Sequence, residues 1–128
     1  DLFVEETVAA DVAFGPENLG LDRAVVDRRV EAALDRVGLS DAHSESVRTL
    51  SGGQARWAAL AGVLAMHPQV VLLDEPAAGL DTTGRDRLRS IISTELAAGN
   101  TLLIATHTPE LYAGCSTEQL HLADGALR

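Results

Sequence analysis

Two short apolar runs on either side of a helical pattern constrain the fold of this chain most. Residues 70–73 read Val-Val-Leu-Leu, and residues 101–105 read Thr-Leu-Leu-Ile-Ala. Continuous runs of this length are typical of strands that are buried on both faces of a parallel sheet. The segment between them is predicted to be a helix that starts at Thr82 or Thr83 and ends at Gly99. The apolar face of that helix consists of Leu88, Ile91, Ile92 and Leu96. This alternation of strand and helix predicts an α/β fold.

A first helix is expected near the start of the chain. Thr7 can cap it, and its pattern runs through Val12. Gly15 and Pro16 are expected to break it, because both residues are unfavourable inside a helix. The sequence therefore predicts a short helix followed by a turn.

A stronger helix is predicted to open at Asp22. Apolar residues recur along it at helical period, namely Val26, Val30, Ala33, Leu34 and Val37. Gly38 stands where a C-cap glycine belongs, and the polar residues 39–49 read as a loop. Residues 1–47 are thus predicted to be mostly helical.

The last part of the chain carries signals for shorter elements. Residues 108–110, Thr-Pro-Glu, combine a cap, a proline and an acid, and they predict a short helix. Residues 118–122 read as a strand, residues 124–125 as a tight turn, and residues 126–128 as the partner strand of a hairpin.

The basic residues restrict what the chain can bind. All ten are arginines, and the net charge is −9. A phosphate-binding loop of the form G-x-x-x-x-G-K-[ST] needs a lysine, so these residues contain no such loop. The arginines are scattered, whereas nucleic acid requires a basic surface, so we expect no nucleic-acid partner. No apolar run approaches the roughly 20 residues that cross a bilayer.

Two acidic residues directly follow the first apolar run. Asp74 and Glu75 would lie at the carboxyl edge of a parallel sheet, where open α/β folds bind their ligands. Asp74 is a candidate ligand for Mg²⁺, which prefers carboxylate and water oxygens. Glu75 could orient and deprotonate an attacking water, which is worth about 10²–10⁴-fold in rate. Taken alone, the pair is also compatible with acidic turn residues after a core strand.

A segment rich in glycine precedes a helix that is predicted to run from Ser51 to about Met66. Its glycines would let backbone amides approach an anion closely, and the N-terminus of the helix carries positive partial charge. Such a segment can receive a phosphate without a lysine. The alternative is a capped helix with a flexible entry. The candidate phosphate-binding residues are Leu50, Ser51, Gly52, Gly53 and Gln54.

These segments resemble, in order and spacing, the motifs of the ATP-binding cassette (ABC) ATPases. Residues 50–54 resemble the signature motif, and residues 70–76 resemble the Walker B motif. Thr106 and His107 resemble the end of the strand that carries the switch histidine. The D-loop is matched by Pro-Ala-Ala-Gly-Leu-Asp, and its candidate site residues are Ala78, Gly79, Leu80 and Asp81. The resemblance implies a fragment of a P-loop NTPase-like ABC nucleotide-binding domain, with a helical subdomain on its N-terminal side.

The resemblance also implies how the ATP sites are shared. In this family two cassettes face each other head to tail, and each signature loop serves the ATP held by the opposite subunit. Glu75 and His107 would then be catalytic, and Asp74 would hold the Mg²⁺ that accompanies ATP. The implied partners are ATP and a second ABC ATPase subunit, in a homodimer or a heterodimer.

The stretch from Thr7 to Leu21 points to one branch of the family. It resembles the segment after the Q-loop in energy-coupling-factor and cobalt/nickel importer ATPases. This implies a subunit on the cytoplasmic face of the cell membrane, bound to a transmembrane coupling subunit of a metal-ion or vitamin importer. Residues 1–47 would be the part of the helical subdomain that follows the Q-loop. Residues 48–128 would be the signature helix and the Walker B half of the ATPase core.

The missing lysine and the start at Asp1 without a methionine predict that this is a C-terminal piece, inactive by itself. Two alternatives stay open. A soluble ABC-type ATPase of DNA repair or translation shares these motifs, but it needs long coiled-coil or basic insertions. A truncated cassette would act only as a binding piece. A glycine-rich loop with Gly-Lys-Ser/Thr upstream of Asp1 would favour the enzyme.

Overall fold

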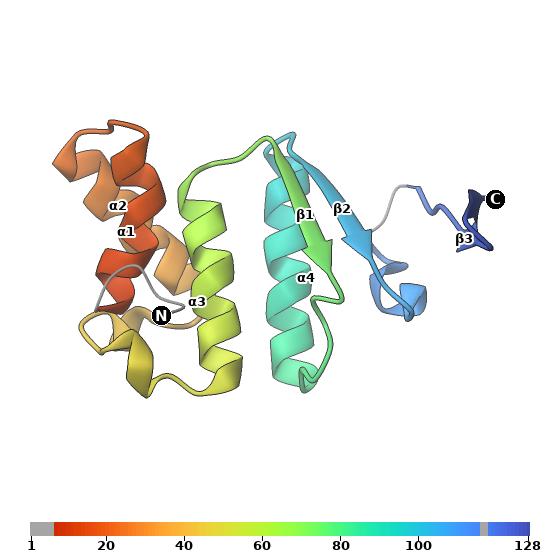
Figure 1. The fold of residues 1–128 in the computed structure, drawn as a ribbon, viewed down its shortest axis with the longest axis horizontal. Helices are drawn as coiled ribbons and strands as arrows, with labels where there is room; N and C mark the ends of the chain where they lie inside the picture. The colour runs from red at the N-terminus through yellow and green to blue at the C-terminus, as the bar shows by residue number, and fades with distance from the viewer. Residues whose placement is uncertain (1–6, 116–117) are drawn as a thin grey trace. The chain divides into compact units, whose positions relative to one another are not determined.

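The computed structural model describes residues 7–115 and 118–128 (Figure 1). The chain divides into two compact units, Asp1–Val71 and Leu72–Arg128. Within the described residues, no helix is both long and apolar enough to cross a membrane. The helices and strands are α1 (Val8–Asn18), α2 (Arg23–Arg36), α3 (Gly52–Ala65), β1 (Val70–Asp74), α4 (Thr82–Ala97), β2 (Thr101–Ala105), β3 (Leu122–Ala123) and β4 (Ala126–Leu127). Short 3-10 turns occur at Ser40–Ala42, Val47–Thr49 and Pro109–Tyr112.

The first unit is a group of three helices around a shared apolar core. Helix α3 packs against both α1 and α2, and these two helices also pack against each other (Figure 1). The fully buried side chains of the unit come from all three helices and include Val8, Val12, Val26, Leu34 and Ala61. Each helix therefore buries one apolar stripe against the other two.

Helix α1 begins at the predicted cap but continues through the predicted break. Thr7 Oγ1 accepts a hydrogen bond from the Ala10 amide at 3.1 Å. The helix includes Gly15 and Pro16, so the prediction of a break there is wrong. A Cβ atom at Gly15 would lie 2.8 Å from side-chain atoms of Met66, and Pro16 is buried. Close packing in the first unit thus outweighs the local preference for a break.

Helix α2 confirms the predicted periodicity. The predicted apolar residues are all buried, namely Val26, Val30, Ala33, Leu34 and Val37. Gly38 has a φ of 73°. The Leu39 amide donates to the Leu34 carbonyl at 2.8 Å, and the Gly38 amide donates to the Asp35 carbonyl at 3.1 Å. These two bonds form a Schellman motif, which explains why the helix ends at a glycine.

The loop between α2 and α3 completes the N-terminal end of α1. The Val8 amide donates to the Glu45 carbonyl at 2.9 Å, and the Ala9 amide donates to the His43 carbonyl at 3.0 Å. The first amides of a helix have no partner within it, so they need acceptors elsewhere. Here the loop supplies those acceptors, which ties it to the helical unit.

The strands β1 and β2 confirm the two predicted apolar runs. They are hydrogen-bonded neighbours, and their arrows point the same way in Figure 1. Their carboxyl ends therefore lie at the same edge of the sheet. Helix α4 packs against β2.

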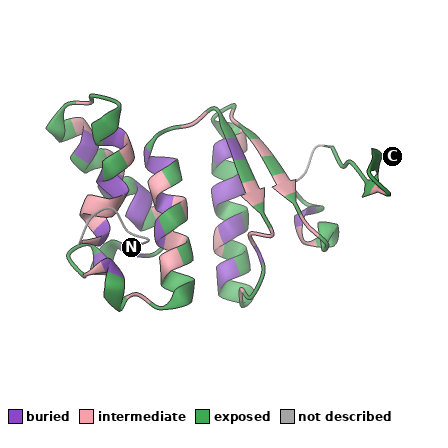
Figure 2. Cartoon of the chain, in the orientation of Figure 1, coloured by how far each residue is buried: buried purple, intermediate pink, exposed green. Residues whose placement is uncertain are grey.

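The two strands are covered on one face only. Val71 is 2% exposed, and Leu88 on α4 is also 2% exposed. Leu72 and Leu103, in contrast, are 71% and 59% exposed. Figure 2 shows exposed segments on both strands. The prediction that both faces are buried is therefore wrong for the described residues. The physical reason is that α4 covers one face, and alternate residues of a strand point to opposite faces.

Helix α4 starts at Thr82, as predicted, and its cap is the residue before. Asp81 Oδ1 accepts a hydrogen bond from the Gly84 amide at 2.8 Å. At the other end Gly99 has a φ of 84°. The Asn100 side chain donates to Glu95 Oε2 at 2.7 Å. This bond provides a partner for the carboxylate of Glu95, which is only 6% exposed.

The C-terminal predictions are confirmed in part. The predicted short helix is a 3-10 turn, Pro109–Tyr112, and Thr108 makes no side-chain cap bond. The predicted strand over residues 118–122 is wrong, because β3 consists of Leu122–Ala123 alone. Strand β3 pairs antiparallel with β4. The predicted turn is confirmed by φ angles of 51° at Asp124 and 77° at Gly125, as a tight hairpin turn requires.

Candidate functional site

The backbone of Glu75 is bent sharply at the end of β1. Its φ angle is 44°, in the left-handed region that residues with a side chain rarely adopt. Its amide donates to the carbonyl of Ala105, the last residue of β2, at 2.8 Å. A left-handed residue other than glycine costs about 1–2 kcal/mol. Such strain is concentrated at functional sites, so the observation marks this edge of the sheet as a candidate site.

The Glu75 carboxylate is held by residues that follow β2. Thr106 Oγ1 donates to Glu75 Oε2 at 3.2 Å. The backbone amide of His107 donates to Glu75 Oε1 at 2.5 Å. These contacts join residues that are 31 and 32 positions apart in the chain. The pairing of β1 with β2 therefore brings the two predicted catalytic residues together.

The imidazole of His107 lies beside this carboxylate and faces solvent. Its Nε2 atom is 3.9 Å from Glu75 Oε1, which is too long for a hydrogen bond. The His107 side chain is 97% exposed, while that of Glu75 is 32% exposed. His107 is thus positioned to contact a group that approaches the edge from outside. Its catalytic role, like that of Glu75, remains a prediction.

Asp74 is the last residue of β1, and it is exposed. Within the described residues, no group of three or more His, Cys, Asp or Glu side chains could hold a metal ion. Mg²⁺ is commonly bound by one or two carboxylates together with phosphate oxygens and waters, rather than by a protein cage. A single exposed carboxylate at the end of a strand fits that mode of binding. Asp74 therefore fits an Mg²⁺ that arrives with a phosphate ligand.

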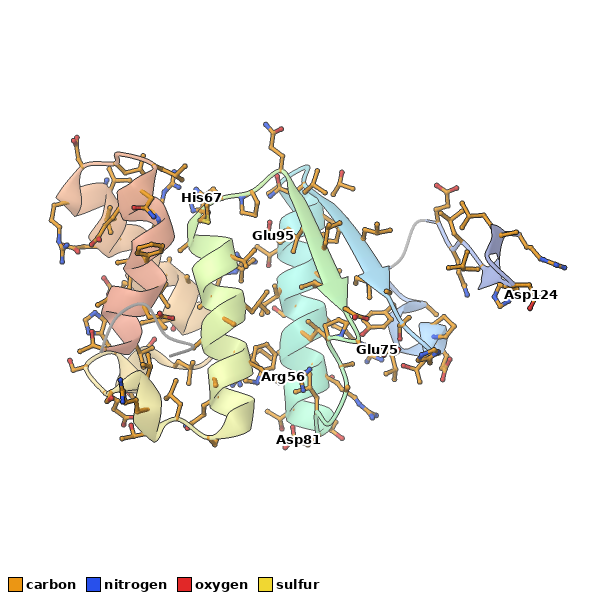
Figure 3. The ribbon with its side chains drawn as sticks, in the orientation of Figure 1. Arg56, His67, Glu75, Asp81, Glu95 and Asp124 are labelled. Carbon is orange, nitrogen blue, oxygen red and sulfur yellow. The ribbon has the colours of Figure 1, made fainter. Side chains whose placement is uncertain are left out.

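The predicted D-loop residues form two consecutive turns between β1 and α4. The Ala78 amide donates to the Glu75 carbonyl at 3.1 Å, and the Leu80 amide donates to the Ala77 carbonyl at 3.1 Å. Gly79 has a φ of 74° within the second turn, which explains the glycine. Asp81 caps α4 from the end of this segment (Figure 3).

Tyr112 is the last residue of the 3-10 turn that follows β2, and it is only 6% exposed. Within the described residues, its buried hydroxyl makes no hydrogen bond of good geometry. Burial raises the pKa of the Tyr112 hydroxyl. The nearby Ala77 backbone opposes part of this rise in pKa, and the charge of Glu75 adds a smaller increase. The turn at residues 109–112 therefore packs close to the turn that follows Glu75.

The signature segment forms the N-terminus of α3. Ser51 Oγ accepts from the Gln54 amide at 3.1 Å, and Gln54 Oε1 accepts from the Ser51 amide at 3.0 Å. This reciprocal pair is a capping box, so Gln54 has a structural role at the helix entry. Leu50 precedes the cap and is half-buried. The predicted helix from Ser51 to about Met66 is confirmed.

Gly52 and Gly53 supply the first two amides of α3. Gly52 and Gly53 are exposed, and a Cβ atom on either would meet no atom within 4 Å. Within the described residues, the structure records no acceptor for their amides. The Ser51 hydroxyl accepts one bond and keeps its own proton to donate. Donors of this kind at a helix N-terminus fit a phosphate oxygen.

Sequence reasoning named Thr106 only beside the candidate histidine and Thr108 only as a helix cap, and it missed their hydrogen bonds around Glu75. The Thr108 amide donates to Thr106 Oγ1 at 3.0 Å, and Thr106 contacts Glu75. The available signal was a hydroxyl residue at the end of an apolar strand, one position before the candidate histidine. That signal could not indicate a contact with Glu75 until the pairing of β1 and β2 was known.

A family model described as ABC transporter matches residues 2–78, which include the signature segment and the Asp74–Glu75 pair. The chain belongs to this family. The cobalt import ATP-binding protein CbiO of Rhodobacter capsulatus is 48% identical over 113 residues, which cover 88% of this chain and 40% of that protein. The energy-coupling factor transporter ATP-binding protein EcfA2 of Symbiobacterium thermophilum is 51% identical over 104 residues, which cover 80% and 36%.

Solved structures agree with this assignment. CbiO1 from Clostridium perfringens, part of the ABC transporter complex CbiONQ, has a TM-score of 0.70 and 37% identity, and the match covers 83% of this chain and 43% of that chain. An inward-facing putative metal-chelate type ABC transporter has a TM-score of 0.79 at 22% identity, which shows the fold alone. The predicted fold class is confirmed. The chain spans less than half the length of CbiO, EcfA2 and CbiO1.

Proposed function

We propose that these residues belong to the ATP-binding and ATP-hydrolysing subunit of an ABC-type membrane importer. The observation that carries the proposal is the strained Glu75 at the end of β1, with its carboxylate oxygens held by Thr106 and by the His107 amide. A carboxylate fixed at an exposed sheet edge can orient a water and accept its proton. The family membership supports ATP as the substrate.

Each functional residue has one expected task. Glu75 accepts the proton of the attacking water, and His107 donates a hydrogen bond to the γ-phosphate. Asp74 would hold the Mg²⁺, which would supply positive charge to neutralise the phosphates. Positioning and electrostatics supply most of the catalysis in phosphoryl transfer, so a rigid edge matters more than covalent chemistry. These 128 residues alone are expected neither to bind nor to hydrolyse ATP appreciably, because they lack the phosphate-binding loop.

The substitution Glu75→Gln tests this proposal. Glutamine keeps the shape of the side chain but cannot accept a proton, so turnover in the complete subunit should fall by about 10²–10⁴-fold. ATP binding should persist, and the ATP-bound dimer should accumulate. Turnover is measured by phosphate release, and binding by titration with a fluorescent ATP analogue. Hydrolysis at the wild-type rate would show that Glu75 is not the base.

The signature segment is proposed to serve the ATP of an opposite subunit. The amides of Gly52 and Gly53 and the Ser51 hydroxyl support this assignment, because they are donors at a helix N-terminus. A heterodimer with Ser51→Arg in one chain and Glu75→Gln in the other places both lesions in one composite site. The second site keeps every part, so much of one site's turnover should remain.

The matched control puts both substitutions in the same chain. That arrangement damages both composite sites, so turnover should be close to zero. Equal activities well above background in the two arrangements would contradict sharing between subunits.

The importer assignment draws on the relatives, which are named as cobalt import and energy-coupling factor proteins. We propose that residues 1–47 contact a transmembrane coupling subunit at the cytoplasmic face of the membrane, and that residues 48–128 serve the ATP sites. Co-purification of the complete subunit with a membrane protein tests this part. Recovery without any membrane protein, but with a DNA-repair or ribosomal partner, would favour the soluble alternative.

A further inference from the structure

The Glu75 carboxylate stands at the end of a chain of hydrogen bonds that starts at Thr108. The Thr108 amide donates to Thr106 Oγ1 at 3.0 Å, and the two threonine hydroxyl oxygens are 3.1 Å apart. Thr106 Oγ1 lies 3.2 Å from Glu75 Oε2. All three residues belong to the second unit, so this series of hydrogen bonds lies within one compact part of the molecule.

The direction of these bonds follows from the number of protons available. A threonine hydroxyl has one proton to donate and two lone pairs that accept. Thr106 accepts the Thr108 amide, and its proton can go either to Glu75 or to the Thr108 hydroxyl. A carboxylate is the stronger acceptor because it is charged. The Thr106 hydroxyl therefore donates its hydrogen bond to Glu75, and the Thr108 hydroxyl donates a hydrogen bond to Thr106. Bonds aligned in this way strengthen one another.

The carboxylate is thus held at both of its oxygen atoms. Thr106 donates to Oε2, and the His107 amide donates to Oε1. Because the two donors lie on successive residues after β2, the plane of the carboxylate is tied to the end of that strand. The Glu75 side chain is 32% exposed, so a water can still reach it.

We infer that Thr106 is a positioning residue for Glu75. Its hydroxyl holds the carboxylate in the orientation in which Glu75 accepts the proton of the attacking water. This inference rests on the proposed function, because it requires Glu75 to be the base. Thr106 acts through Glu75 and touches no reacting atom.

The test compares two substitutions of Thr106 in the complete subunit with its partner subunits. Thr106→Val keeps the shape but removes the hydroxyl. It should lower kcat by about 10- to 100-fold, because a reacting group displaced by about 1 Å can cost about 10²-fold. The KM for ATP should stay close to the wild-type value, since the lost contact orients the base rather than the nucleotide. Thr106→Ser keeps the hydroxyl and should retain most of the turnover.

The control is Thr101→Val at the opposite end of β2. Thr101 is exposed and starts the strand, so the same chemical change there should leave kcat unchanged. A thermal melt of each variant shows whether the fold is intact. Wild-type kcat for Thr106→Val would overturn the inference. So would an equal loss in Thr106→Ser, which would show that the methyl group matters, or a rise in KM with unchanged kcat.

Glu75→Gln, measured in parallel, separates this inference from the proposed function. If Glu75→Gln lowers turnover strongly while Thr106→Val keeps the wild-type kcat, the base is confirmed and only the positioning role fails. If Glu75→Gln keeps turnover, the proposed function fails together with the inference. Adding Thr106→Val to Glu75→Gln should cause no further loss, because Thr106 acts through the residue that is already altered.

Discussion

The signature segment and the edge around Glu75 are built in opposite ways. In the signature segment, the two capping bonds join Ser51 and Gln54, which are three positions apart. At the acidic edge, Glu75 is joined to Thr106 and His107 across 31 and 32 positions. The first arrangement needs only the start of a helix, whereas the second exists only when β1 and β2 are paired. Local and long-range contacts therefore build two different kinds of site in one short chain.

The supporting structure differs in the same way. The three helices of the first unit bury their apolar stripes against one another. In the second unit, α4 covers one face of the sheet, while Leu72 and Leu103 remain exposed on the described strands. The signature helix thus packs into a three-helix core, whereas the acidic edge belongs to a sheet that is covered on one face. This difference predicts that a substitution in the core of one unit destabilises that unit and leaves the stability of the other unchanged.

The largest expected effects are those of two core leucines. Leu34 is fully buried in the first unit, and Leu88 is 2% exposed in the second. Each Leu→Ala change should cost about 2–5 kcal/mol. Leu34→Ala should speed amide hydrogen exchange in α1, α2 and α3, and Leu88→Ala should speed it in β1, β2 and α4. If Leu88→Ala loosened α3 as much as β2, the two units would not be independent.

The matched control for both variants is Leu72→Ala. Leu72 is 71% exposed in this chain, so its truncation should change stability by less than about 0.5 kcal/mol. A loss as large as that of Leu88→Ala would show that the outer face of β1 is covered in solution.

Two glycines give the next largest effects, with opposite signs. Gly79 has a φ of 74° in the turn after Glu75, so Gly79→Ala should destabilise the second unit by about 1–2 kcal/mol. Gly62 lies inside α3, and a Cβ atom there would meet no atom within 4 Å, so Gly62→Ala should stabilise the first unit by about 0.5–1 kcal/mol. Urea unfolding followed by circular dichroism measures both. The same sign for both changes would contradict the backbone argument.

The most local effect is expected for Ser51→Ala. Loss of the cap should cost about 1 kcal/mol and fray the first turn of α3, because one of its amides loses an acceptor. Amide exchange at Gln54 should rise, while exchange at His107 should not change. Faster exchange at His107 would mean that the two sites are coupled through the fold.

Residues whose structure depends on near neighbours were predicted well. The capping of α1 by Thr7 and of α3 by Ser51 is confirmed, as is the glycine that ends α2. The two strands and the hairpin turn at residues 124–125 are confirmed as well. For the caps, the glycine and the hairpin turn, the signal and the interaction lie within a few positions of each other, so local preference and final structure agree.

The errors fall where distant contacts decide. Gly15 and Pro16 stay helical because α1 packs closely on Met66, 51 positions after Gly15. Leu72 is exposed although its run predicted burial, because burial depends on what covers each face of a sheet. No rule of local sequence could report either outcome.

The sequence by itself determined the family, the order of the motifs and the residue types at the candidate sites, because all of these are properties of short segments. Tertiary structure alone decided that Glu75 takes a left-handed backbone and that its carboxylate meets Thr106 and the His107 amide. The physical reason is that a hydrogen bond across 31 positions requires α4 to carry the chain back to the start of the sheet, so that β2 can end at the same edge as β1.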